Sequence, residues 1–138
     1  KLLDLDYFKI QPPKSTGREV FNLNLIQDFI NEDSCDLLRT LTELTATTIA
    51  DNVKNYSPKC EELIISGGGY KNSFLIELIE SKLESVNILS TDDFGLPTDA
   101  KEAVCFAYLA YLHIKGKTGN LPKVTGSSKK VILGVSSI

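Results

Sequence analysis

The sequence has no methionine and no tryptophan, one histidine and three cysteines among its 138 residues. Because Met is missing even at position 1, we expect a processed chain or a piece cut from a longer protein. The single histidine, His113, excludes a site that needs several His ligands, and near a helix end we expect it to cap or pack. Cys35, Cys60 and Cys105 match no zinc spacing, and an odd count makes a poor disulfide framework. We therefore expect free thiols in a reducing cytoplasm, with Cys35 and Cys105 buried on helices.

Long apolar runs and a strong charge bias are also missing. No run approaches the roughly 20 apolar residues that cross a bilayer, and no charged-then-apolar stretch suggests a signal peptide. The formal net charge is −3, with the basic residues scattered, so we expect neither a nucleic-acid nor a membrane partner. The content of 42% hydrophobic and 24% charged residues fits one folded domain with a core.

The stretch that organises the rest is an apolar triplet followed by three glycines. Leu63–Ile65 predicts a short buried strand, and Gly67, Gly68 and Gly69 then break the pattern ahead of a helix expected over 72–84. Such a turn leaves amide N–H groups near a helix N-terminus, and glycine lets an anion or the edge of a nucleotide approach. The alternative is a tight turn without a ligand.

The remaining periodicity predicts an α/β fold in which helices outnumber strands. We expect helices over 16–30, 33–56, 72–84 and 97–115, and strands over 62–66, 86–89 and 131–135. Capping boxes are expected at Thr16/Glu19 and Asp99/Glu102, and Asp33 or Ser34 should cap the second helix. The strand–helix–strand order over 62–89 predicts a parallel βαβ unit.

The glycine turn matches a dinucleotide-binding fingerprint only in part. Gly67 and Gly69 fit G-x-G-x-x-G, but Asn72 stands at the third glycine position, where a larger side chain hinders helix–strand packing. Asp92 lies near the place of a ribose-binding acid, which keeps this alternative open.

Several blocks together resemble the carboxyl-terminal part of anhydro-N-acetylmuramic acid kinases, in the family's order and over nearly the whole chain. The blocks are Pro12–Glu19 with Phe21-Asn22, Leu41–Ala46, Gly67–Gly69 with Asn72, Thr91-Asp92 with Glu102-Ala103, Gly119–Pro122, Val124–Gly126 and Leu133-Gly134.

The resemblance implies the sugar kinase, actin and heat-shock chaperone superfamily, whose members hold ATP between two ribonuclease-H-like lobes. Residues 1–138 would be a single domain, the carboxyl-terminal nucleotide-binding lobe of a two-lobe kinase. It would be a helix-rich, partial ribonuclease-H-like (actin-like ATPase) lobe whose short parallel βαβ sheet is packed by helices. The family phosphorylates 1,6-anhydro-N-acetylmuramic acid with opening of the anhydro ring, in bacterial cell-wall recycling.

The resemblance assigns few site residues to this chain. Gly67, Gly68, Gly69 and Asn72 match the superfamily's adenosine motif, and Glu102 matches a glutamate thought to face the sugar. The general base, the phosphate loop and most of the site for Mg2+ belong to the absent amino-terminal part, so no catalytic residue is expected here. The block 12–18 is a family marker without an assigned role, and Pro97-Thr98 departs from the small residues common in relatives.

The implied cofactors are ATP and Mg2+, and the implied partners are the amino-terminal lobe and an amino sugar, in the bacterial cytoplasm. A homodimer is left open. Two other functions remain as alternatives: a non-catalytic nucleotide-binding or chaperone-like module of the same superfamily, and a dinucleotide-binding domain.

Overall fold

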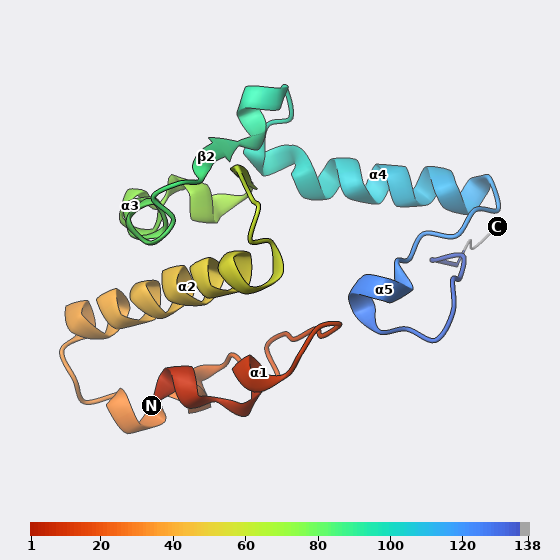
Figure 1. Ribbon diagram of the computed structural model, residues 1–138. Coiled ribbons are helices and arrows are strands. Elements are labelled where there is room, and N and C mark those ends of the chain that lie inside the picture. The colour runs from red at the N-terminus through yellow and green to blue at the C-terminus, as the bar shows by residue number, and fades with distance from the viewer. Residues whose placement is uncertain (136–138) are drawn as a thin grey trace.

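Helix α2, Ser34–Tyr56, runs through the middle of the fold between two layers of structure (Figure 1). The computed structural model describes residues 1–135. The Asp33 carboxylate caps α2 by accepting hydrogen bonds from the amides of Cys35 and Asp36 at 2.9 and 3.2 Å. The helix ends before Pro58, which cannot continue it. Both boundaries confirm the sequence prediction.

On one side of α2 lies the expected βαβ unit. Strand β1, Glu62–Ile65, leads through a 3-10 turn at Gly68–Lys71 into α3, Ser73–Lys82, and then into β2, Asn87–Ser90. The two strands are parallel, with Leu63 opposite Ile88, and among residues 1–135 they are the whole sheet.

The core is formed where α2, α3 and one face of the sheet meet. Its buried residues are Ala46 and Ala50 from α2, and Ile79 and Leu83 from α3 and its end. Because alanine has only a methyl group, α3 packs closely against α2, and the side chains of Leu63 and Ile65 close the sheet side.

On the other side of α2 lies an amino-terminal layer of short turns: η1 Leu2–Asp4, α1 Asp6–Lys9 and η2 Leu23–Phe29. The helix predicted over 16–30 is wrong. Asn22 is extended, donates to the Arg18 and Glu19 carbonyls, and accepts from the Asn24 amide, so its side chain ends one turn and begins the next. The capping box at Thr16/Glu19 therefore has no helix to cap.

The carboxyl-terminal part consists of η4 Thr91–Phe94, η5 Thr98–Ala100, α4 Lys101–Ile114 and α5 Pro122–Thr125. The strand predicted over 131–135 is wrong, because backbone groups there bind elsewhere. The Val131 amide donates to Asn120 Oδ1 at 2.7 Å, and the Leu133 carbonyl lies 2.8 Å from His113 Nδ1. His113 thus ties the segment to α4, in keeping with the expected packing role.

Two smaller predictions also fail. Cys35 and Cys105 are free thiols as expected, but both are exposed rather than buried. No capping box forms at Asp99/Glu102, because α4 begins at Lys101 without a side-chain cap and Asp99 binds elsewhere. Gly116, with φ of 61°, follows the last turn of α4.

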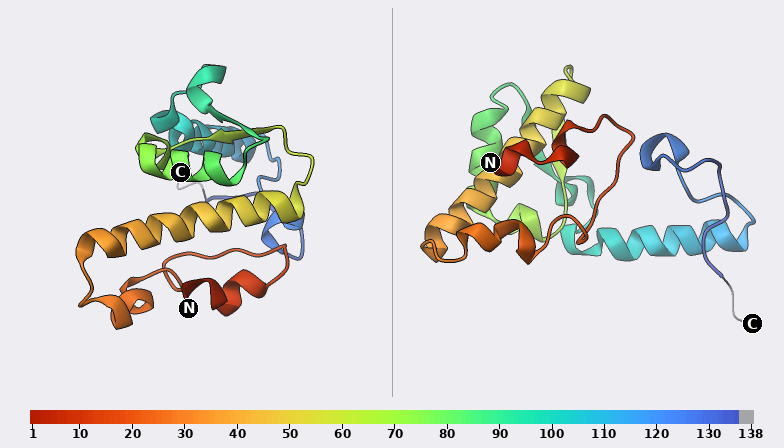
Figure 2. Two further views of the ribbon diagram at one scale, coloured as in Figure 1. Left: turned by 60° about the vertical axis from the view of Figure 1, so that its left-hand side comes forward. Right: turned by 90° about the horizontal axis from the view of Figure 1, so that it is seen from below.

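The architecture is α/β, with α2 and α3 packed on one face of a short parallel sheet, and the sequence predicts it at that level. Figure 2 shows α2 lying between the amino-terminal layer and α3, with α4 extending away from them. None of the helices in residues 1–135 has the length and hydropathy that a membrane span requires.

Candidate functional site

The glycine turn forms an open surface at the carboxyl end of β1. Gly67 has φ of 84° and ψ of −175°, a backbone conformation that a side chain disfavours. A Cβ built on Gly67 or Gly68 would meet no heavy atom within 4 Å, and one on Gly69 would meet only Leu75 Cδ2 at 3.8 Å. The protein itself therefore leaves the space above the first two glycines empty, where a flat ligand can lie on bare backbone.

Asn72 begins the helix that follows this turn. Its Oδ1 accepts a hydrogen bond from the Leu75 amide at 3.2 Å, which makes it the N-cap of α3. Gly68 and Gly69 belong to the 3-10 turn Gly68–Lys71, which lies between β1 and Asn72, so the glycines precede the N-terminus of α3 by about one turn.

An ion pair joins the glycine turn to the start of α4. Lys71 Nζ donates to Asp99 Oδ2 at 2.7 Å, across 28 residues of sequence. The hydrogen bond to Asp99 and its negative charge raise the pKa of Lys71, with a smaller contribution from Asp92. Glu102 lies three residues after Asp99, exposed on the first turn of α4. The glycines thus follow the carboxyl end of β1, and Glu102 follows the carboxyl end of β2 through η4 and η5.

The Asp92 carboxylate accepts hydrogen bonds from groups at the end of β2 and at the start of η5. Its Oδ2 accepts from Ser90 Oγ at 2.9 Å and its Oδ1 from the Thr98 amide at 3.2 Å. Asp93 completes a capping box with Ser90, its Oδ2 accepting from the Ser90 amide at 2.8 Å. These bonds fix the loop after β2 against η5 and give Asp92 a structural role. Thr91 Oγ1 is buried beside them with no partner among the described residues.

The pairing of Lys71 with Asp99 is not evident from the sequence. Each follows the carboxyl end of one strand, and the carboxyl ends of parallel strands meet at one sheet edge. That signal places both residues at the same edge, but their pairing depends on side-chain reach, which a sequence pattern does not give.

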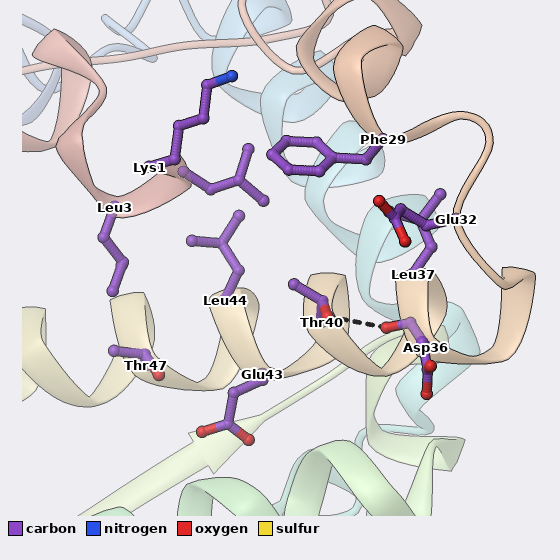
Figure 3. Close-up of a pocket in the computed structure, with 11 residues that line it drawn as sticks. Lys1, Leu3, Phe29, Glu32, Asp36, Leu37, Thr40, Glu43, Leu44 and Thr47 are labelled. Carbon is purple, nitrogen blue, oxygen red and sulfur yellow. Dashed lines mark hydrogen bonds between the residues drawn. The ribbon is translucent and has the colours of Figure 1, made fainter.

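A cavity of about 470 Å³ lies elsewhere, between the amino-terminal layer and α2 (Figure 3). Its walls are mainly apolar, and the Thr40 hydroxyl beside it donates to the Asp36 carbonyl of its own helix at 2.8 Å. Glu43 points away from this cavity and binds Lys82 at 2.6 Å. Polar groups therefore do not converge on it, and it is not the candidate site.

Metal ligands do not gather in the part of the chain that the structure describes. Within residues 1–135 no group of three His, Cys, Asp or Glu side chains is placed to hold an ion. Asp92 and Asp93 are already engaged by backbone and hydroxyl donors.

Comparison with known proteins identifies similar sequences. A family model described as anhydro-N-acetylmuramic acid kinase matches residues 1–137. The anhydro-N-acetylmuramic acid kinase of Synechococcus elongatus is 42% identical over 134 residues, which are 94% of this chain and 35% of the relative. That of Coxiella burnetii is 42% identical over 137 residues, which are 97% of this chain and 37% of the relative. The chain thus spans little more than a third of the length of these relatives.

Proposed function

Because the chain belongs to the anhydro-N-acetylmuramic acid kinase family, we propose that it is the carboxyl-terminal, nucleotide-binding lobe of such a kinase. The full-length protein phosphorylates 1,6-anhydro-N-acetylmuramic acid with ATP and opens the anhydro ring with water, giving N-acetylmuramic acid 6-phosphate for cell-wall recycling. The observation that carries this proposal is the open glycine surface at the carboxyl end of β1.

In this proposal the glycines support the adenosine part of ATP. The bare backbone of Gly67 and Gly68 gives the nucleotide a flat surface without displacing any side chain. The exposed Lys71–Asp99 ion pair joins that surface to η5, the turn that leads into α4 and Glu102. Asn72, which we assign to the nucleotide side, acts by holding the start of α3 beneath the turn. Glu102 is our candidate for a contact to the sugar.

The residues present fit a nucleotide but not a magnesium site. Phosphoryl transfer depends on positioning and on charge stabilisation by a metal ion and cationic groups. Within residues 1–135 no set of acidic side chains converges for Mg2+, so we assign the ion, the phosphate loop and the general base to the remainder of the protein. This chain's task is to bind and orient.

The fold proposed for the whole protein is the actin-like one, two ribonuclease-H-like lobes around an ATP cleft. A parallel βαβ unit flanked by helices is compatible with one such lobe. We propose the bacterial cytoplasm as its location, where ATP is available and free thiols such as Cys35 remain reduced.

One alternative is a non-catalytic, chaperone-like nucleotide-binding module of the same superfamily. The upstream coding sequence discriminates between the two. A glycine-rich phosphate loop and an aspartate motif there support the kinase, and their absence supports the module.

The nucleotide proposal predicts a ligand preference. In the full-length protein, ATP or ADP binds more tightly than NAD, because Asn72 is committed to capping α3 where a dinucleotide site requires a third glycine, and Asp92 is bonded inside the fold. Isothermal titration calorimetry measures the three dissociation constants. Tighter binding of NAD would reverse the assignment in favour of a dinucleotide-binding domain.

A further inference from the structure

Helix α4 is apolar around its whole circumference and is largely exposed. Its sequence is KEAVCFAYLAYLHI, and both of its charged residues, Lys101 and Glu102, lie in the first turn. A helix that is hydrophobic on all sides is normally buried. Yet none of its residues is buried, and among residues 1–135 it makes its main contacts with η5 and with the segment around Leu133. Figures 1 and 2 show it extending away from the βαβ unit.

Two faces of α4 are uncovered. Val104, Tyr108 and Tyr111 follow helical spacing along one face, with 50%, 60% and 50% of their surface exposed. Phe106, on the opposite side of the helix, is 71% exposed, and Ile114, one turn beyond Tyr111, is 80% exposed; both lie beside the carboxyl-terminal segment. The rings of Tyr108 and Tyr111 stack at 6.4 Å, so the first face presents an ordered aromatic surface.

The face of the sheet that points away from the core is also exposed. Ile64 of β1 points away from the core and is 48% exposed, while its neighbours Leu63 and Ile65 pack on the core. On the side away from β2, the edge of β1 has no strand partner among the described residues. An exposed strand edge and an exposed apolar helix are surfaces that folded proteins cover.

We propose that α4, through its Val104–Tyr108–Tyr111 face, is an interface that packs against the amino-terminal part of the same polypeptide. The proposal rests on the part of the proposed function that makes this chain one portion of a longer protein. The chain spans 35% and 37% of two relatives, so most of a full-length protein lies outside this structure.

A second copy fits this surface less well. A two-fold contact buries one patch on each subunit, whereas α4 is exposed on opposite faces and Ile64 requires cover as well. A covalently joined segment also meets α4 at a high effective concentration, without the need for a second molecule.

The test is photo-cross-linking of the full-length protein with p-benzoylphenylalanine in place of Tyr108. The expected product is an intramolecular cross-link from position 108 to residues upstream of Lys1, located by peptide mass spectrometry. Tyr56 is the matched control, since its hydroxyl donates to Gln11 at 3.2 Å, and the same substitution there should cross-link within this chain. A cross-linked dimer, or cross-links from position 108 only to residues 1–138, would overturn the proposal.

Native Cys105, exposed on α4 here, gives a second measurement that needs no substitution. In monomeric full-length protein we expect its alkylation to be slower than in urea by about tenfold or more. Equal rates, or protection lost on dilution from dimer to monomer, would contradict the interface. A kinase assay on the same sample distinguishes the interface from the proposed function. Protection of Cys105 in a protein without kinase activity would contradict the proposed reaction but support the interface.

Discussion

Residues 1–138 alone should give no sugar phosphate from ATP, Mg2+ and 1,6-anhydro-N-acetylmuramic acid, while the full-length protein gives it readily. The reason is that phosphoryl transfer requires a metal ion, a cradle for the phosphates and a base held in one geometry. Within the described residues no acidic group converges for a metal, and the glycine surface is open to solvent above Gly67 and Gly68. Mass spectrometry of the sugar product measures both reactions.

Circular dichroism of the same fragment provides the control, because a helical spectrum shows that the lack of product is not due to an unfolded chain. Phosphorylated sugar formed by the purified fragment above a buffer blank would show that the chain carries its own catalytic groups. The assignment of the metal site, the phosphate loop and the general base to the rest of the protein would then be wrong.

Replacing Gly68 with valine in the full-length kinase should raise the KM for ATP by about tenfold or more, equivalent to roughly 1.4 kcal/mol. A β-branched side chain would occupy the space that the nucleotide needs. Gly68 lacks the positive φ found at Gly67, and its Cβ would meet no protein atom within 4 Å. The substitution should therefore leave the melting temperature without ligand nearly unchanged. Steady-state kinetics and thermal melts measure the two effects separately.

Two further variants serve as controls. Gly67→Val has the same side chain at φ of 84°, so it should lower the melting temperature, because strain of order 1–3 kcal/mol enters the fold. Glu102→Ala should raise the KM for the sugar more than the KM for ATP. A Gly68→Val enzyme that folds normally and keeps its KM for ATP within about a factor of two, roughly 0.4 kcal/mol, would make the glycine turn structural only.

The central elements of the fold could be predicted from sequence because their signals are local. Asp33 before an apolar stripe marks the start of α2, and the apolar triplet followed by glycines marks β1 and its turn. The parallel pairing of β1 and β2 follows from their spacing, since a helix lies between them.

The failures arise where a side chain competes with regular backbone structure. Asn22 bonds to three backbone groups and replaces the expected helix over 16–30 with shorter turns. Asn120 similarly accepts the hydrogen bond of the Val131 amide, which therefore does not pair in the expected last strand. Asp99 could satisfy either a helix cap or a distant lysine, and only the tertiary fold places Lys71 within 2.7 Å of it. Such choices depend on contacts between residues far apart in sequence.

Hydrogen–deuterium exchange of the full-length protein with and without a non-hydrolysable ATP analogue tests the central claim most directly. The peptide that contains Gly67–Gly69 should exchange more slowly when the analogue binds, because the ligand lies on that backbone. The peptide covering the middle of α2, around the buried Ala46, should not respond and serves as the internal reference. Slower exchange confined to the glycine turn and its neighbours in space is the predicted result. Analogue binding that leaves the exchange of Gly67–Gly69 unchanged would contradict the assignment of this turn as the nucleotide-binding surface.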